Sequence, residues 1–284
     1  MSDIGLDYRV PGPDVADYAT LFYFFNTDLA VFEDTERADH AQVRFRLDDG
    51  AAEYHFPDGT VQQAPPVHVL GPTSAAFKVR AEGPVRLFGW GVTAGGWGAM
   101  MGGDASNALN RMLDGVAVLG QRIMAARAQF QAARDIDEMA AIATCLIRDL
   151  VGDACDDVVQ FARQVDSWLE DSNSPEIDDL ITATGLSRRQ VERKCNAIYG
   201  APPKLLARKF RALRAAVAMR GRDLSFDDAV GHGFYDQSHL IREVKQFTGL
   251  TPKQIRDQPT ALAAITVAQR TALNGQVKTL ISET

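Results

Sequence analysis

Apolar and polar positions alternate along the first third of the chain, a pattern typical of strands that bury one face. Between residues 41 and 47 the apolar members of the alternation are Val43, Phe45 and Leu47. Turn sequences rich in Gly, Pro and Asp interrupt the apolar segments at residues 48–50, 57–60 and 81–84. Short strands at this spacing predict a small antiparallel β-barrel or sandwich, which we assign to residues 1–118.

The periodicity becomes helical beyond residue 95 or so. Within residues 135–151, apolar side chains recur every three or four positions, as on one face of an amphipathic helix: Met139, Ile142, Leu146 and Leu150. A polar, Pro-terminated stretch at residues 171–175 then separates this region from the next. We therefore expect a helical connector and linker over residues 119–174, ending at a domain boundary.

Residues 175–258 have the pattern of two helix-turn-helix units, and the first begins with a short helix over residues 177–184. Gly185 makes the turn, and a second helix begins after Ser187. Ser187 and Gln190 form a capping box, which satisfies two backbone N–H groups at the start of that helix. The N-terminal turn of such a helix reaches base edges in the major groove. In this chain the helix carries four charged candidates: Arg188, Arg189, Glu192 and Arg193.

A long helix that opens at Pro202-Pro203 and runs to about Arg220 leads to the second unit. Ser225 is expected to cap a short helix over residues 226–230, and Gly233 makes the turn. Asp236 begins the second reading helix, which ends at Gly249, and Pro252 opens the last helix of the unit. Residues 259–284 are rich in Ala and Thr and are expected to form an appended helix or a partly ordered tail. The predicted fold class is thus α+β, with an all-α C-terminal domain.

The charge is distributed unevenly between these parts. The net charge of the chain is -7. Residues 175–258 hold 15 Lys and Arg against 10 Asp and Glu, a balance of +5, whereas the remainder has a balance of -12. A basic region on an acidic chain indicates contact with a polyanion, although a solvated charged surface can produce the same asymmetry.

Other function classes lack the residues they need. His40, His55 and His68 occur in the β-rich part, but no His-x-His pair is present, so we expect no metal site. Neither a G-x-S-x-G, a Walker A nor a dinucleotide-binding glycine pattern occurs, and we expect no cofactor and no enzymatic activity. Cys145, Cys155 and Cys195 are scattered, as in a cytoplasmic protein with reduced thiols. No stretch approaches the roughly 20 apolar residues of a membrane helix.

Two sequence stretches carry a resemblance to a known family. Gly233-Phe234-Tyr235-Asp236-Gln237-Ser238-His239-Leu240, followed by Phe247-Thr248-Gly249-Leu250-Thr251-Pro252 and Arg256, resembles the signature of AraC/XylS transcription regulators. Leu186-Ser187-Arg188-Arg189-Gln190-Val191-Glu192-Arg193 resembles the first reading helix of that family. The resemblance covers about 80 residues. It implies two subdomains that are joined by the long helix and present one helix each to successive segments of the major groove.

The resemblance also implies homodimers on paired or direct-repeat sites, a sensing or dimerising N-terminal domain, and activation as the commoner outcome. Residues 1–120 resemble, more faintly, the cupin-like N-terminal domain of a subgroup. The residues that carry this are Pro57-Asp58-Gly59, Leu70-Gly71-Pro72 and Leu87-Phe88-Gly89-Trp90-Gly91-Val92, with Gly96 and Ala99. Three positions depart from the family pattern, because Cys195, Asp228 and His232 stand where it favours apolar residues. The last two predict a less stable second unit.

The candidate binding residues fall into three groups. We expect base reading from Arg188, Arg189, Glu192, Arg193, Gln237, Ser238, His239 and Arg242, with pairing of Glu192 to a neighbouring arginine as the alternative. We expect phosphate contacts from Ser187, Lys194, Lys204, Arg208 and Lys245. A ligand pocket in the N-terminal domain is expected to use Phe22, Phe24, Phe45, Tyr54, Trp90 and Trp97, whose alternative role is ordinary core packing.

Two functions remain open at this point. In the first, the protein is a cytoplasmic dimer that binds double-stranded DNA. A small molecule enters its N-terminal domain and shifts the dimer between DNA-binding arrangements. In the second, the N-terminal domain acts only in dimerisation or protein–protein control, through helices in residues 120–170. Contact with RNA polymerase is a further expected interaction of an activator.

Overall fold

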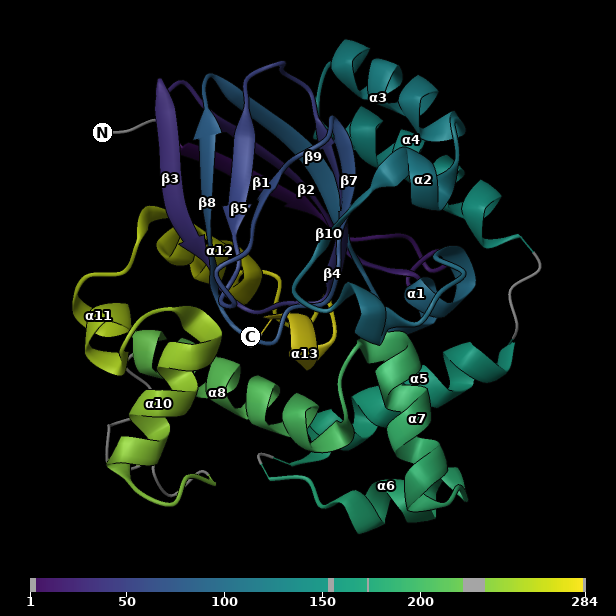
Figure 1. The fold of residues 1–284 in the computed structure, drawn as a ribbon, viewed down its shortest axis with the longest axis vertical. Coiled ribbons are helices and arrows are strands. Elements are labelled where there is room, and N and C mark those ends of the chain that lie inside the picture. Colours follow the sequence, from purple (N-terminus) through teal and green to yellow (C-terminus); the bar gives the residue numbers. More distant parts are fainter. Residues whose placement is uncertain (1–3, 153–155, 173, 222–232, 283–284) are drawn as a thin grey trace.

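The computed structural model describes residues 4–152, 156–172, 174–221 and 233–282. Strands occupy the N-terminal part, and helices make up almost all of the chain from residue 115 onward, which confirms the α+β class (Figure 1). Among the described residues, no helix is both long and apolar enough to cross a membrane. The helix expected at residues 226–230, with Ser225, Asp228 and His232, lies outside the described residues, as does Cys155.

The strands form two antiparallel sheets. One has six strands in the order β1-β2-β9-β4-β7-β10, and the other has four in the order β3-β8-β5-β6. Their bounds are β1 Ile4–Arg9, β2 Ala19–Thr27, β3 Val31–Glu36, β4 Ala41–Arg46, β5 Ala52–His55, β6 Val61–Gln63, β7 Val67–Leu70, β8 Phe77–Glu82, β9 Val85–Val92 and β10 Met112–Asp114. The sheets are not joined into a closed barrel. Of the two predicted forms, barrel and sandwich, the sandwich therefore describes this part.

The six-stranded sheet is covered on both faces. One face meets the small sheet in a cluster that includes Phe25, Phe32 and Phe77. The other meets helices α3 (Arg122–Ala132) and α4 (Ile136–Val151), where Phe130 packs 4.7 Å from the ring of Phe45. Both faces of β4 are therefore buried: the apolar residues face the helices, and the polar residues Gln42 and Arg44 on the other face are buried as well.

Three short helices lie beside the sheets, and most of the remaining helices form the lower half of Figure 1. Beside the sheets are α1 (Ala94–Met100), a 3₁₀ helix η1 (Ala105–Ala108) and α2 (Gly115–Leu119). Then follow α5 Asp156–Asp171, α6 Ile177–Thr184, α7 Arg188–Tyr199, α8 Pro203–Gly221, α10 Gln237–Thr248, α11 Pro252–Asp257, α12 Ala261–Thr271 and α13 Thr279–Ser282. The long α8 joins the two helical units as expected, and the tail forms α12 and α13.

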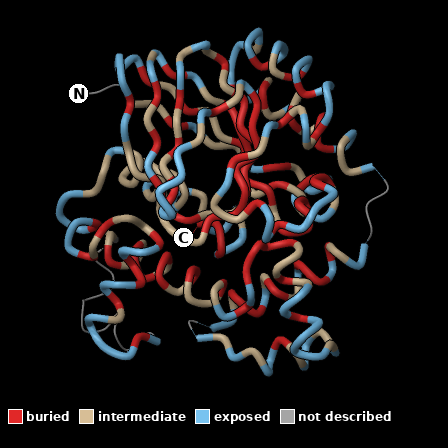
Figure 2. Tube along the Cα trace, in the orientation of Figure 1, coloured by how far each residue is buried: buried red, intermediate tan, exposed pale blue. Residues whose placement is uncertain are grey.

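Both helical units dock on the N-terminal part. Helix α7 packs against α1 and η1. At the end of α10, the N–H of Ala38 donates to the carbonyl of Phe247 at 2.6 Å, and the N–H of Ala76 donates to that of Gln246 at 2.9 Å. Gly249 has a φ of 77°, and a Cβ there would lie 2.5 Å from Thr35 Cγ2. This close approach requires glycine. Figure 2 shows buried residues continuing from the sheets into the helices at these contacts.

Candidate functional site

Helix α7 presents the expected polar face to solvent. Its capping box is present, because Ser187 Oγ accepts from the N–H of Gln190 at 3.4 Å and the Ser187 N–H donates to Gln190 Oε1 at 3.0 Å. Behind this cap the four candidate base-reading residues are exposed: Arg188, Arg189, Glu192 and Arg193. Arg188 donates to Asp178 of α6 at 3.0 Å, an exposed pair that contributes little stability and leaves the guanidinium accessible.

The opposite face of α7 is core. Cys195 is fully buried, and burial raises the pKa of its thiol to about 12, so it is a protonated, apolar filler. Lys194, one of the expected phosphate contacts, is only half-exposed, with its ammonium 5.1 Å from the ring centre of Phe161 in α5. This cation–π contact holds Lys194 toward α5.

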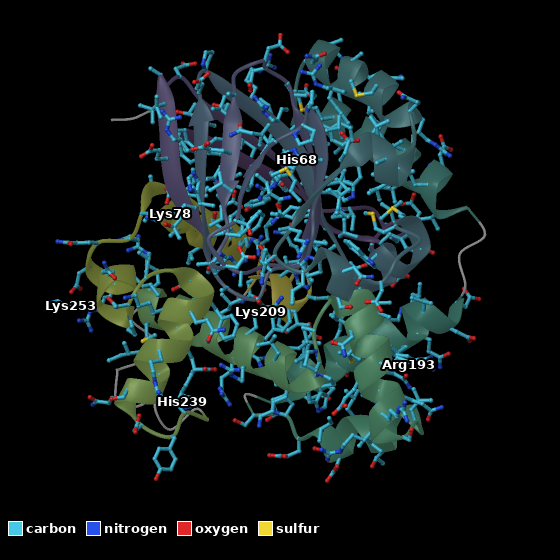
Figure 3. The ribbon with its side chains drawn as sticks, in the orientation of Figure 1. His68, Lys78, Arg193, Lys209, His239 and Lys253 are labelled. Carbon is cyan, nitrogen blue, oxygen red and sulfur yellow. The ribbon has the colours of Figure 1, made fainter. Side chains whose placement is uncertain are left out.

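Helix α10 begins as expected at Asp236, whose carboxylate accepts from the N–H of His239 at 2.7 Å. Four candidates along α10 are exposed: Gln237, Ser238, Arg242 and Lys245. His239 is different, because its ring accepts from the Tyr235 N–H at 3.1 Å and packs edge-on to Phe234 at 5.7 Å. These contacts hold the His239 ring at the turn, and the base contact expected of it stays a prediction (Figure 3).

Tyr235, next to this turn, is a surface residue that the sequence interpretation overlooked. Its side chain is 92% exposed, although large aromatic side chains are usually at least partly covered. It directly precedes the N-cap of α10. The signal available from the sequence was an aromatic residue immediately before the predicted N-cap Asp236.

Arg208 is partly exposed and its guanidinium is held by an ion pair, whereas Lys204, near the start of α8, is exposed. The guanidinium of Arg208 donates to the buried carboxylate of Glu243 in α10, from Nη2 at 2.7 Å and from Nε at 3.0 Å. The bonds to Glu243 raise the pKa of Arg208. Arg208 thus links α8 to α10, and Lys204 is the more accessible of these two candidates.

Sequence comparison identifies this helical region. Residues 180–258 match a family model described as a helix-turn-helix domain. This part of the chain is an AraC-type helix-turn-helix domain. The AraC-type domain places the chain among DNA-binding transcription regulators. None of the curated proteins matches the chain in sequence.

Solved structures with a similar arrangement have low sequence identity. ToxT from Vibrio cholerae is 8% identical with a TM-score of 0.45, covering 82% of this chain and 100% of ToxT. The same protein bound to an unsaturated fatty acid is 9% identical with a TM-score of 0.47, covering 84% and 96%. The AraC-like transcriptional activator CuxR is 14% identical with a TM-score of 0.31, covering 74% and 86%. Similarities of this size assign no ligand to the chain.

The structure contains a cavity of about 150 Å³ where the N-terminal strands meet the C-terminal helices. Its apolar lining comes from both sheets, from α8 and from α12, with Leu6, Phe32, Leu213 and Val267 as examples. Of the six aromatic residues expected in a pocket, only Tyr54 lines this cavity. Phe22, Phe45, Trp90 and Trp97 are buried on the α3–α4 side of the large sheet, and Phe24 packs beside them.

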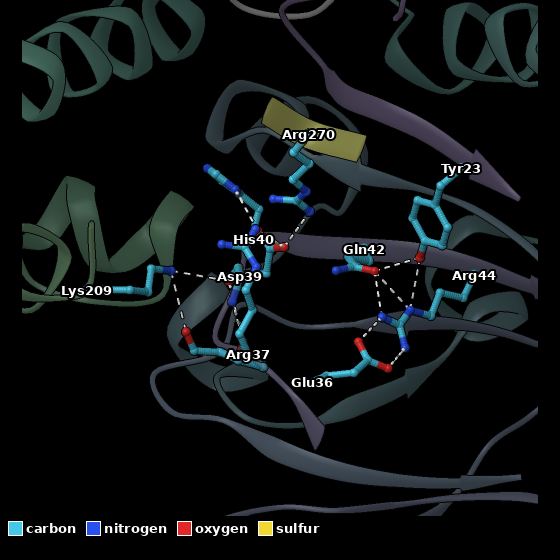
Figure 4. A network of polar contacts seen from close by, with 10 residues as sticks. Tyr23, Glu36, Arg37, Asp39, His40, Gln42, Arg44, Lys209 and Arg270 are labelled. Carbon is cyan, nitrogen blue, oxygen red and sulfur yellow. Dashed lines mark hydrogen bonds and ion pairs between the residues drawn. The ribbon is translucent and has the colours of Figure 1, made fainter. Parts of the chain in front are cut away.

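A buried polar cluster forms one wall of the cavity (Figure 4). Arg44 donates to Glu36 at 2.8 Å and to the hydroxyl of Tyr54 at 2.8 Å, and it also bonds Gln42 and Tyr23. His68 lies behind Tyr54, with its ring Nδ1 3.1 Å from the carbonyl oxygen of Pro65. Burial and the charge of Arg44 lower the pKa of His68 to about 3, so this histidine is neutral.

A second polar cluster surrounds Asp39. Its carboxylate accepts from Arg37 at 3.2 Å and from Arg270 of α12 at 2.7 Å. Burial alone would raise the pKa of Asp39, but these two arginines hold it well below its ordinary range. The ammonium of Lys209 in α8 donates to the Asp39 carbonyl at 3.2 Å, and burial lowers the pKa of Lys209 to about 8. Two guanidinium groups thus meet the Asp39 carboxylate, and the Lys209 ammonium meets the backbone carbonyl of the same residue.

Lys209 and Arg270 were both missed by the sequence interpretation. Lys209 falls on the buried stripe of α8, three positions from Leu206 and four from Leu213, and that spacing was the signal for its burial. For Arg270 the sequence held no comparable signal. Among the described residues, no group of three or more His, Cys, Asp or Glu side chains is placed to hold a metal.

Proposed function

We propose that the protein is a sequence-specific activator that binds paired DNA sites as a homodimer and responds to a small molecule in the interdomain cavity. The DNA-binding part of this proposal rests on one observation: both reading helices, α7 and α10, have an exposed and capped start. Each presents its first turn to solvent on the side away from the sheets (Figure 1). Helix N-termini and basic side chains in this position favour contact with DNA.

Within this proposal, base edges are contacted by Arg188, Arg189, Glu192, Arg193, Gln237, Ser238 and Arg242. Arginine pairs with guanine edges and glutamine with adenine edges, each contributing about 1–3 kcal/mol of discrimination. Lys204, Lys245 and Ser187 contact phosphates. His239 and Arg208 act indirectly, because their contacts within the protein position α10.

The ligand proposed for the cavity is an apolar molecule with an acidic group. Its support is the lining, which has many apolar residues and more arginines than carboxylates. The arginines are Arg37, Arg44, Arg46, Arg220 and Arg270, and the carboxylates are Glu36, Asp39 and Asp48. Cavities with a few convergent polar groups on an apolar wall are the usual form of small-molecule sites. Because the cavity is shared by the sheets and by α8, an occupant contacts both parts of the chain.

The test uses the full-length chain. Binding sites are selected from random double-stranded DNA, and the enriched sequences are tested for paired half-sites by footprinting. A library of amphipathic acids is then screened by thermal shift, and each hit is measured for its effect on affinity for the selected site. In vitro transcription with RNA polymerase tests activation. Failure to enrich any sequence contradicts the DNA-binding proposal. Enrichment without any effective ligand favours the alternative, an N-terminal domain that acts only in dimerisation or protein–protein control.

A further inference from the structure

The C-terminal segment after the AraC-type domain forms one wall of the cavity. One face of α12 supplies residues at helical spacing to the lining: Leu262, Ala263, Thr266, Val267 and Arg270. Leu262 and Ile265 also pack against the cluster between the two sheets. The segment therefore covers an opening that the sheets and α8 leave between them.

Polar contacts hold this segment at both ends. The N–H of Leu262 donates to Asp34 of β3 at 2.9 Å. Beyond α12, Lys278 pairs with Asp166 of α5 at 2.9 Å, and the buried Leu280 follows. Yet no residue of α12 itself is fully buried. A helix with these few buried contacts opens locally at a lower cost than the core.

The contact between Arg270 and Asp39 is a largely buried ion pair that attaches α12 to the rest of the protein. The Arg270 side chain is only 13% exposed, its Nη2 lies 2.7 Å from Asp39 Oδ2, and its guanidinium lies 5.9 Å from the centre of the Tyr8 ring. Within the part of the chain that the structure describes, the buried Nε of Arg270 has no hydrogen-bond partner. A guanidinium on the cavity wall with an unused donor is suited to an additional anion.

The residues around Asp39 connect this contact to the AraC-type domain. The carbonyl of Asp39 accepts from Lys209 of α8, and the N–H of its neighbour Ala38 donates to Phe247 of α10. Helix α12 also begins only a few residues after α11, whose Ile255 packs in the same cluster as Phe247. A displacement of α12 is thus transmitted to the second helix-turn-helix unit by two routes.

We propose that residues 260–282 are a lid on the cavity, latched by Arg270 on Asp39, and that opening of the lid frees the AraC-type domain from the N-terminal part. In the closed state the docking of α7 and α10 fixes the spacing of the reading helices. An acidic ligand competes with Asp39 for Arg270 and opens the latch, and Asp39 keeps its bond to Arg37. This regulation rests on the proposed function for its ligand and its DNA.

The first experiment needs neither DNA nor a natural ligand. Hydrogen exchange of the full-length chain is followed for Arg270→Met, with Arg134→Met as control, because Arg134 is 84% exposed and pairs with Glu138, four residues along the chain. Exchange within α12 should be faster by on the order of tenfold in Arg270→Met and unchanged in Arg134→Met. Exchange in β9 should be unchanged in both. If α12 of Arg270→Met exchanges at the wild-type rate, the proposed latch is wrong.

A second measurement avoids any substitution. The anionic probe 8-anilinonaphthalene-1-sulfonate should speed exchange in α12 of the wild-type chain without affecting β9. If the probe binds and α12 does not respond, the competition for Arg270 is wrong. On the selected DNA, Arg270→Met should bind about fivefold or more tightly than wild type without any ligand. If Arg270→Met binds this DNA as tightly as wild type or more weakly, the proposal that the lid controls DNA binding is wrong. If no DNA is ever bound, the proposed function fails while the exchange measurements still decide on the lid.

Discussion

The buried carboxylate of Glu243 in α10 lies within 2.7 Å of Nη2 and 3.0 Å of Nε of Arg208 in α8. Arg211 at 3.8 Å and His239 at 3.9 Å lie further from the same carboxylate. The two helices are separated in sequence by the turn of the second unit, so this bidentate pair fixes how the second reading helix crosses the long one. This geometry supports a structural role for Arg208, and the phosphate contact that the sequence indicated stays a prediction.

Arg208→Met should lower the free energy of unfolding by about 2 kcal/mol, because it leaves a buried carboxylate with only its weaker partners. DNA affinity should fall on every sequence through misplacement of α10. Urea unfolding of the full chain measures the first effect, with Lys245→Met, an exposed position on α10, as a control of unchanged stability. Unchanged stability together with a shallower salt dependence would assign Arg208 to a phosphate instead.

The reading and phosphate residues should separate in a comparison of sequences. Arg188→Ala and Gln237→Ala should relax the preference at one position of the selected site, by about 1–3 kcal/mol of discrimination each. Lys204→Ala should weaken binding evenly across sequences and reduce the slope of log affinity against log salt by about one. Fluorescence anisotropy on a panel of single-base variants at several salt concentrations provides both readouts. If all three variants lose the same affinity on every sequence, the assignment of Arg188 and Gln237 to base edges is wrong.

Tyr235 should contribute to DNA binding without contributing to stability, because a side chain that is 92% exposed loses little packing when it is removed. Tyr235→Ala should weaken binding to the selected site, while its melting temperature stays that of wild type. Tyr235→Phe separates the two parts of the side chain. If Tyr235→Phe binds as tightly as wild type, the ring makes the contact. If Tyr235→Phe binds as weakly as Tyr235→Ala, the hydroxyl makes a hydrogen bond. Wild-type affinity for Tyr235→Ala would exclude the residue from the interface.

Local features of the two units were predictable because they depend on a few adjacent residues. The capping box of Ser187 and Gln190, the cap at Asp236 and the turn at Gly185 each follow from short-range backbone geometry. Exposure of the charged face of α7 follows from the same periodicity. These features place most of the candidate DNA contacts without any knowledge of the tertiary structure.

The cavity was not predictable in the same way, because alternation gives the faces of a strand but not what each face meets. Phe45 and Arg44 are neighbours on β4, and both are buried, one against α3 and the other against the cavity. The pocket expected from aromatic residues therefore fell on the core face. The ion pair of Asp39 with Arg270 joins residues that are 231 positions apart, which no local pattern specifies.

The buried, neutral His68 should make the fold sensitive to acid. Its pKa is about 3 in the folded chain against an ordinary 6.5, so below pH 6.5 the unfolded chain binds a proton that the folded chain does not. Stability that is fully present above pH 6.5 is then lost as the pH falls toward 3, by about 2 kcal/mol between pH 7 and 5. His68→Asn, whose side-chain N–H can replace the ring Nδ1–H at Pro65, should lose correspondingly less over this interval. Urea unfolding at the two pH values measures the difference, and parallel losses in both proteins would show that His68 is protonated in the folded state.

Filling the cavity should separate ligand response from DNA binding. Ala81 of β8 is 6% exposed and lines the cavity, so Ala81→Phe places a ring in the space proposed for the ligand. Binding of 8-anilinonaphthalene-1-sulfonate and of any thermal-shift hit should be lost, at a cost in stability of about 1–3 kcal/mol. The candidate reading residues of α7 and α10 do not line this cavity, and α10 reaches it only at its last residue, Thr248, so ligand-independent DNA binding should remain. Ala125→Phe, an exposed position on α3, makes the same side-chain change outside the cavity and should leave probe binding intact. Probe binding that survives Ala81→Phe as well as it survives Ala125→Phe would place the ligand elsewhere on the protein.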